Sequence, residues 1–263
     1  MSNNIFEPMD PIRFGWNTPK SNIRFFVVLM VIVAALYYFP ALIQMMFLSK
    51  ALSLPEAFSL EIIAIFLAVV YVIIYQVAEL GLLSIALNFR DGKTPEIEDL
   101  FRNYRLFLKY FAASIIYGLM VAVGSIFLIV PGIYLALKYM FYGYLIVDKG
   151  LGPIDALKES GRMTEGAKKD LLVFWLTLGC SIIVIMIFLG LFIAIPVGVI
   201  TAAFSKNLVP IIALVANLIS MIINLLIVVP ITKLSMADIY RILQVRLAAS
   251  VAALPTETAP VEA

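Results

Sequence analysis

Histidine is absent from the 263 residues of this chain, and its single cysteine, Cys180, lies inside an apolar run. Without histidine there is no His-based proton relay, no HExxH zinc site and no Ser–His or Cys–His nucleophile. One cysteine excludes an intrachain disulfide. A G-x-S-x-G motif is also missing, and "RDGKTPE" has Leu87 where a phosphate-binding loop requires glycine. We therefore expect no catalytic residue, no metal and no cofactor.

Charged residues are scarce as well, at 14% of the chain, whereas hydrophobic residues make up 63%. A soluble domain typically has about 25% charged and about 45–50% apolar residues. The apolar surplus is too large for one soluble core, so the composition predicts an all-α membrane protein. The net charge of +2 does not favour binding to nucleic acid.

Long apolar runs are what the chain has instead. A helix needs about 20 apolar residues to cross the hydrocarbon of a bilayer. This criterion predicts six transmembrane helices as three hairpins within one membrane domain, residues 1–247, and a disordered tail over residues 248–263. The fourth span is short, and Pro131-Gly132 is expected to form a tight turn before it. The predicted spans cover residues 25–48, 60–87, 106–130, 132–148, 171–195 and 209–232.

The distribution of basic residues predicts the orientation. All 19 lysines and arginines except Lys50, Lys138 and Lys206 lie in the terminal segments or in the loops that follow even-numbered spans. Because cytoplasmic loops are enriched in Lys and Arg, this pattern predicts a multi-pass protein with both termini in the cytoplasm. An even number of spans is required to keep the 148–170 loop on that side.

Each predicted hairpin follows a cytoplasmic segment that is expected to be an amphipathic elbow helix, over residues 9–23, 94–108 and 153–169. The second is the most regular, with Thr94 as N-cap, Pro95 at the first helical position and acids in the first turn. Such helices lie at lipid headgroups. We expect headgroup contacts from five basic side chains: Arg102, Arg105, Lys109, Lys168 and Lys169.

Three stretches resemble a group of uncharacterised bacterial integral membrane proteins of the glycerophosphodiester phosphodiesterase membrane-domain type. They are "FGWNTPKSN", "IVPGIYLALKYMFYGYLIVDKGLGPIDALKESGRMTEG" and "ADIYRIL". The resemblance covers roughly residues 10–245 and includes Lys138 and the Ala156, Leu157, Ser160 stretch. It implies six helices in a bacterial cytoplasmic (inner) membrane. The phosphodiesterase chemistry of that group belongs to a soluble domain that this sequence does not contain.

Polar residues inside the predicted spans are the candidate site. Glu79 and Lys138 are expected at the same depth, roughly 13–15 Å from the cytoplasmic face at 1.5 Å per residue. An intramembrane ionisable group usually faces the helix bundle and pairs. Three interpretations stay open: a structural ion pair, a lysine that extends toward the interface, and a substrate or ion site. The predicted polar cluster comprises Gln76, Glu79, Lys138, Thr177, Ser181, Asn217, Ser220 and Asn224.

These observations favour a non-catalytic inner-membrane protein that binds membrane lipids or another membrane protein. The alternative is a small transporter or channel that uses the level of Glu79, Lys138 and Asn224 as a polar site. A lipid-headgroup enzyme ranks third because the catalytic groups are missing.

Overall fold

The computed structural model describes residues 5–51, 58–203, 215 and 218–252, and every regular element in these segments is a helix. By length and composition, four of the described helical segments can cross a membrane. A fifth is added if the bent pair Met9–Ser21 and Ile23–Tyr38, with 95° between its halves, counts as one span. The six predicted spans are therefore not all reproduced. The four segments are Ile62–Arg90, Asp99–Phe127, Ile129–Lys149 and Leu218–Ala252.

The N-terminal part contains three helices: α1 (Met9–Ser21), α2 (Ile23–Ala51) and α3 (Phe58–Arg90). Helix α1 is a full elbow helix despite Pro19 near its end. It crosses the last helix, α11 (Val229–Ala252), closely, because a Cβ at Gly15 would lie 2.4 Å from the Ser235 hydroxyl. Helices α2 and α3 pack against each other. They coincide with the first two predicted spans and extend them at both ends.

The second elbow is not the continuous amphipathic helix that the sequence predicts. Only α4 (Asp99–Arg102) and the 3-10 turn η1 (Tyr104–Leu106) form before α5 (Phe107–Phe127) begins. Asp99 explains the difference, because its buried carboxylate accepts hydrogen bonds from the Glu96 N–H at 3.1 Å and the Asn88 amide at 3.2 Å. The chain is thereby held in a turn instead of a helix from Thr94.

The fourth predicted span is two helices, α6 (Ile129–Tyr139) and α7 (Tyr142–Lys149), separated by a break at residues 140–141. The turn before it also differs from the prediction. Leu128 is extended, with φ −165° and ψ 149°, and α6 begins at Ile129. Pro131 therefore lies in the first turn of α6, where its missing N–H leaves no intrahelical bond unmade.

The C-terminal part comprises α8 (Pro153–Met163), α9 (Lys168–Ala203), the π-helix η3 (Asn224–Val228) and α11 (Val229–Ala252). Pro153 occupies the start of α8, as predicted for the third elbow. The π turn precedes Pro230, which cannot donate a helical hydrogen bond. Helix α11 continues to Ala252, into the segment predicted as a disordered tail, and residues 253–263 lie outside the described part.

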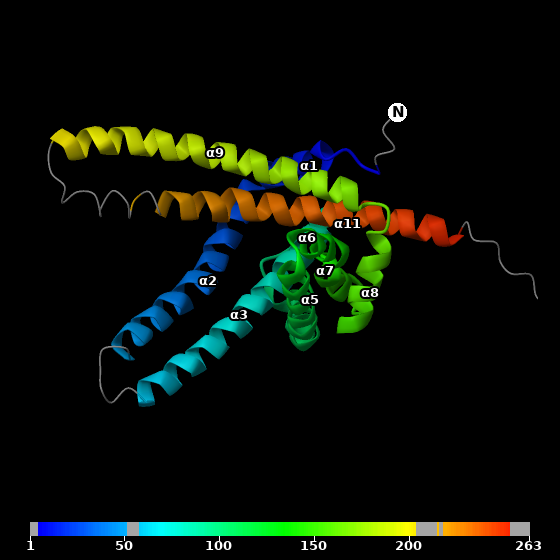
Figure 1. The fold of residues 1–263 in the computed structure, drawn as a ribbon, viewed down its shortest axis with the longest axis horizontal. Coiled ribbons are helices and arrows are strands. Elements are labelled where there is room, and N and C mark those ends of the chain that lie inside the picture. Colours follow the sequence, from blue (N-terminus) through cyan, green and yellow to red (C-terminus); the bar gives the residue numbers. More distant parts are fainter. Residues whose placement is uncertain (1–4, 52–57, 204–214, 216–217, 253–263) are drawn as a thin grey trace, which may run out of the picture.

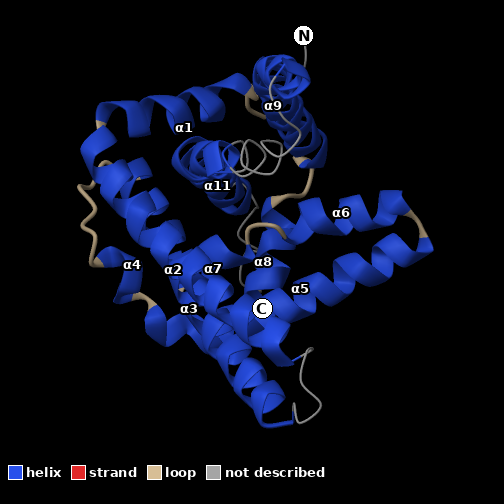
Figure 2. Cartoon of the chain, turned by 90° about the vertical axis from the view of Figure 1, so that its left-hand side faces the viewer, coloured by secondary structure: helices blue, strands red, loops and turns tan. Residues whose placement is uncertain are grey.

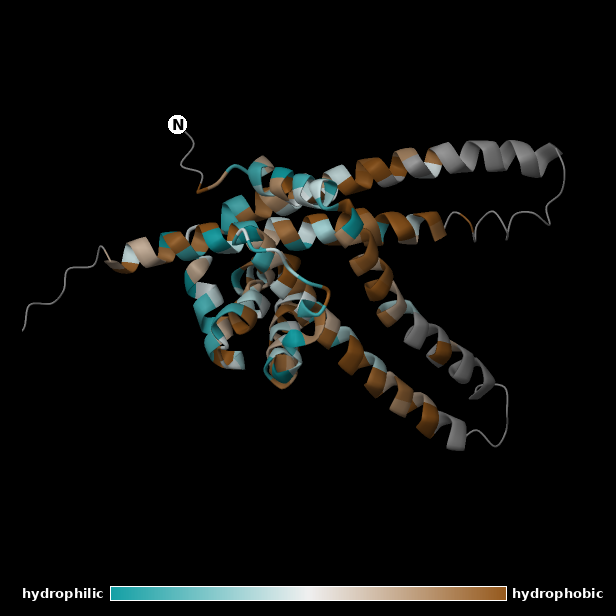
Figure 3. Cartoon of the chain, turned by 180° about the vertical axis from the view of Figure 1, so that it is seen from behind, coloured by the Kyte–Doolittle hydropathy of each residue, from teal (hydrophilic) through white to brown (hydrophobic). Residues whose placement is uncertain are grey.

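The buried core lies where the helices converge, in a region that we call the hub. It consists of the start of α2 up to Val33, the end of α3 from Ala78, α7, α8, the start of α9 and α11 from Pro230 to Leu243. From the hub, α2 and α3 extend in one direction, while α5 and α6 project as a separate pair (Figures 1 and 2). Hydrophilic residues gather around the hub and apolar residues cover the projecting helices (Figure 3). The surface around the hub is thus the polar end of the molecule.

Candidate functional site

Glu79 on α3 is buried, but its ion-pair partner is Lys233 and not Lys138. Its other carboxylate oxygen accepts a hydrogen bond from the Tyr37 hydroxyl of α2 at 2.9 Å. The sequence-based prediction ended the last span at Thr232 and therefore assigned Lys233 to the cytoplasmic C-terminal segment. Since α11 continues through that position, Lys233 stays on a helix that packs against α3.

The Glu79–Lys233 pair is enclosed by aromatic side chains. The Tyr37 and Tyr75 rings lie 4.7 Å apart between centroids, and the Tyr144 hydroxyl donates to the Lys233 carbonyl oxygen at 2.9 Å. Four elements, α2, α3, α7 and α11, thus meet at this pair. The arrangement fixes helices relative to one another, and its polar groups are bonded to each other.

The other members of the predicted cluster do not join Glu79. Thr177 and Ser181 donate to carbonyl oxygens of their own helix, at 2.8 and 2.7 Å. Gln76 is half-buried, with its amide nitrogen 3.4 Å from the Ser114 hydroxyl. Ser220 is half-buried and Asn224 is exposed at the start of the π-helix. Asn217 lies outside the described residues.

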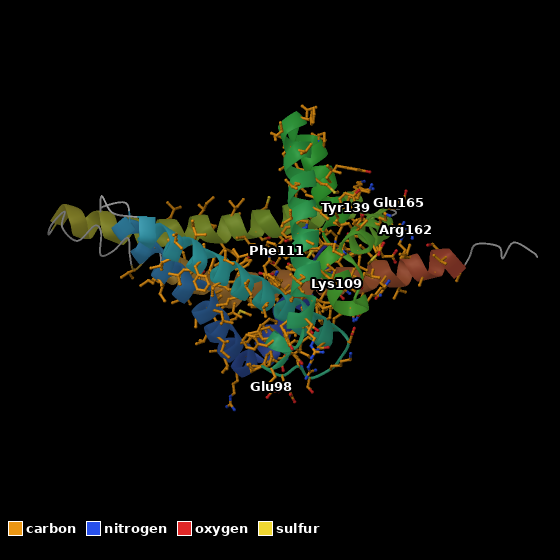
Figure 4. The ribbon with its side chains drawn as sticks, turned by 90° about the horizontal axis from the view of Figure 1, so that it is seen from below. Glu98, Lys109, Phe111, Tyr139, Arg162 and Glu165 are labelled. Carbon is orange, nitrogen blue, oxygen red and sulfur yellow. The ribbon has the colours of Figure 1, made fainter. Side chains whose placement is uncertain are left out.

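Lys138 instead lines a pocket of about 450 Å³ between α5, α6, α8 and the start of α9. We call it the basic pocket, since four of its lining residues are cations and one, Glu165, is an acid. Figure 4 shows Tyr139, Arg162 and Glu165 close together on this side of the molecule. The lining consists of Ile116, Met120, Tyr134, Lys138, Tyr139, Ile154, Leu157, Lys158, Gly161, Arg162, Glu165 and Lys168.

The break between α6 and α7 positions Lys138 in this pocket. The Ser160 hydroxyl accepts a hydrogen bond from the Phe141 N–H and donates to the Lys138 carbonyl oxygen, both at 3.1 Å. The Thr164 hydroxyl lies 3.0 Å from the same carbonyl. These hydroxyls replace bonds that a continuous helix would make. Gly161 leaves room for the lysine, because a Cβ there would lie 3.2 Å from Lys138 Cε.

The charges of the basic pocket are only partly neutralised. In the described part of the chain Lys138 forms no salt bridge, and its ammonium lies 5.1 Å from the centre of the Tyr139 ring. Lys168 lies 4.8 Å from the Tyr134 ring centre. Arg162 contacts Glu159 at 3.8 Å, and its side chain is largely exposed. The pocket therefore presents cations beside aromatic rings.

Of the five predicted headgroup contacts, only Lys168 lines the basic pocket. Arg102 pairs with Asp99 at 2.8 Å, and Lys109 donates to the Gly150 carbonyl oxygen at 2.7 Å. Arg105 lies over the Tyr104 ring, 5.8 Å from its centre, and Lys169 is exposed. Figure 4 shows Lys109 apart from the group of Tyr139, Arg162 and Glu165.

The sequence analysis did not single out Lys158 and Arg162, which lie on the third elbow helix and line the pocket. Asp155 and Glu159 alternate with them in sequence, as on a solvated face where opposite charges pair. The helical spacing of four residues between Lys158 and Arg162 was the available signal. Within the described residues, no group of acidic or cysteine side chains is arranged to hold a metal ion.

No model of a known protein family matches the chain, and neither a curated protein nor a solved structure matches it. The resemblance to the bacterial membrane-domain group accordingly stays a prediction. Function must be inferred from the geometry of the molecule itself.

Proposed function

We propose that the protein is a non-catalytic, multi-pass membrane protein that binds anionic lipid headgroups at the cytoplasmic face of a bacterial inner membrane. The observation that carries this proposal is the basic pocket, where Lys138, Lys158, Arg162 and Lys168 surround a space of about 450 Å³. A lipid phosphate carries the complementary charge. Hydrogen bonds between cationic side chains and phosphate are among the stronger polar contacts in proteins.

The walls of the basic pocket favour a lipid over a soluble anion. Ile116 and Met120 belong to α5, whose outward-facing Ile115 and Leu119 are exposed apolar residues. A headgroup held by the cations can therefore leave its acyl chains along α5. Tyr134 and Tyr139 supply aromatic rings of the kind that accumulate at membrane interfaces.

The positions of the other cations support a cytoplasmic hub. Arg102, Arg105 and Lys169 lie around the hub and not on the projecting helices, which agrees with the positive-inside pattern of the sequence. Both termini would then be cytoplasmic. Another membrane protein is a second possible partner of the apolar helix surfaces, but no specific contact of the described residues favours it.

The transporter alternative has less support. It requires an open polar level at Glu79, whereas Glu79 is bonded to Lys233 and Tyr37. Lys138 lines the basic pocket and does not contact Glu79. Thr177 and Ser181 of α9 donate hydrogen bonds to carbonyl oxygens of their own helix. Lys233 also lines a pocket of about 460 Å³, but its ammonium is bonded to Glu79, so a structural ion pair is the simpler role for these two residues.

Lipid binding by the purified protein in detergent is the direct test. Native mass spectrometry should detect phosphatidylglycerol bound in preference to phosphatidylcholine. Lys138→Met combined with Arg162→Gln should weaken phosphatidylglycerol binding by about tenfold or more, since one hydrogen bond to a charged group contributes ~1.5–3 kcal/mol.

The matched control is Lys93→Gln, which removes an exposed cation outside the pocket and outside the predicted headgroup contacts, and it should leave binding within about twofold, as for a surface charge. Equal binding of both lipids by the unaltered protein would contradict the proposed function. A preference for phosphatidylglycerol that survives the double change would contradict the assignment to the basic pocket. Inorganic phosphate added as a competitor should not displace the lipid.

A further inference from the structure

We infer that α5 and α6 form a hairpin that enters the membrane leaflet on the hub's side and returns without crossing. Its partner is the acyl-chain region of that leaflet. Length and composition alone admit both segments as spans. The inference is carried by the free length of the two helices, the composition of their turn and the direction of the pair. It does not depend on lipid binding in the basic pocket.

The free length of the hairpin is too short for a crossing. The base of α5 is held in the hub through the buried Tyr110 and Ala113, so the helix projects from Ser114 to Phe127. At 1.5 Å per residue that segment is about 20 Å long, whereas the hydrocarbon core is about 30 Å thick. Helix α6 has 11 residues and reaches about 16 Å.

Helix α7 does not extend α6 into the membrane. The break at residues 140–141 separates the two, and Tyr144, Leu145 and Ile146 are buried in the hub. Counting α6 and α7 as one span would therefore count hub residues as membrane-facing ones. This explains why the fourth predicted span falls at the lower limit of length.

The turn of the hairpin is apolar. Residues 126–130 read Ile-Phe-Leu-Ile-Val, and their exposed fractions range from 68% at Leu128 to 82% at Ile126. No charged residue occurs between Lys109 and Lys138. A turn that emerged into water on the far side would expose this whole patch, whereas a turn inside a leaflet places it among acyl chains.

The sequences that follow α2 and α9 differ from this turn. Lys50 stands in the last turn of α2, Glu56 stands between α2 and α3 in the sequence, and Lys206 follows the end of α9. A charged residue is costly among acyl chains. The turn between α5 and α6 has none, which sets this pair apart from the other helices.

The backbone of the turn is arranged to reduce unpaired polar groups, which are costly in hydrocarbon. Pro131 removes one N–H from the first turn of α6. The Leu128 N–H donates to Gly124, at 3.2 Å. The two helices also approach closely, because a Cβ at Gly132 would lie 2.1 Å from the Ser125 hydroxyl. A compact turn of this kind fits within a leaflet.

The direction of the pair gives a further argument. α5 and α6 leave the hub in a direction different from that of α2, α3 and α9 (Figure 4). If those longer helices cross the bilayer, α5 and α6 are inclined to the membrane normal. They then reach even less far into the hydrocarbon than their length allows. Removing two of the six spans predicted from the sequence leaves four, an even number, so the basic loops remain on one side. Lys138, near the base of α6, then lies at headgroup depth.

Cysteine accessibility tests the inference on the full chain, in spheroplasts of a bacterium in which the protein is expressed. Cys180 is first replaced by Ser, and single cysteines are introduced as Phe127→Cys in the turn, Lys206→Cys and Ser250→Cys. A membrane-impermeant maleimide should label Lys206→Cys from outside and Ser250→Cys only after lysis. Phe127→Cys should remain unlabelled under both conditions and react after denaturation, because maleimide reacts with a hydrated thiolate.

Labelling of Phe127→Cys from outside at the rate of Lys206→Cys would show a crossing and overturn the inference. Labelling of Phe127→Cys only after lysis would show that the turn lies in water on the cytoplasmic side, and this would also overturn the inference. A nitroxide attached at Phe127→Cys provides the second measurement. Its collisions with oxygen should exceed those with a water-soluble nickel chelate, and the reverse ratio would contradict insertion. Size-exclusion profiles identify any variant that fails to fold.

Discussion

At the scale of the residue, Glu79 shows how this chain keeps a carboxylate in an apolar setting. Its two oxygens bind donors from different helices, the Tyr37 hydroxyl of α2 and the Lys233 ammonium of α11. Removing a charge from water costs several kcal/mol, which a partner must offset. The pair therefore stabilises the junction of α2, α3 and α11 only while both members are present.

Glu79→Gln should lower the free energy of unfolding by about 3–5 kcal/mol, because Lys233 is left partly buried without its counter-charge. The double variant Glu79→Gln/Lys233→Met should recover at least half of that loss. Chemical denaturation in detergent measures both values. Glu98→Gln, an exposed carboxylate outside any ion pair of the described residues, is the control and should change stability by less than about 0.5 kcal/mol. Additive losses in the double variant would rule out coupling between the two residues.

At the scale of the element, the break between α6 and α7 depends on side chains from α8. Ser160 is fully buried and bonds both the Phe141 N–H and the Lys138 carbonyl. Thr164 adds a second donor to that carbonyl. The backbone groups freed by the break are thus satisfied without water, and α6 can turn away from α7.

Ser160→Ala should destabilise the protein by about 1–3 kcal/mol, because the buried Phe141 N–H loses its acceptor. Ser181→Ala is the matched control, since the Ser181 hydroxyl is exposed and bonds its own helix. The control should stay within about 0.5 kcal/mol of the unaltered chain. Thermal unfolding in detergent compares the two variants. Similar midpoints would show that the α8 hydroxyl does not stabilise the break.

Hydropathy predicted the positions of the long helices but not their surroundings. The first two spans, expected at 25–48 and 60–87, correspond to α2 and α3. Ile126 and Ile146 are equally apolar, yet one is exposed in the turn and the other is buried in the hub. Because apolar residues suit both the lipid and the protein core, the sequence pattern cannot distinguish lipid-facing residues from core residues. The partner of Glu79 and the break at residue 140 depend on tertiary contacts and were missed for that reason.

At the scale of the whole molecule, Arg241 joins segments that are far apart in sequence. Its guanidinium donates two hydrogen bonds to Asp91 after α3, at 2.8 and 2.7 Å, and two to Asp148 on α7, at 2.8 and 2.9 Å. The Tyr240 hydroxyl also donates to Asp148, at 2.8 Å. Only arginine offers a planar fork that serves two carboxylates at once.

Arg241→Gln should therefore lower stability by about 1.5–3 kcal/mol, because two partly exposed carboxylates lose their hydrogen bonds to a shared cation. Arg241→Lys should recover only a minor part, since an ammonium cannot form four bonds in this geometry. Arg246→Gln, which removes an exposed bond to the Glu165 carbonyl at 3.0 Å, is the control and should cost less than about 1 kcal/mol. Thermal unfolding ranks the three variants. If Arg241→Lys equalled the unaltered chain, charge alone and not the forked geometry would hold α3, α7 and α11 together in the hub.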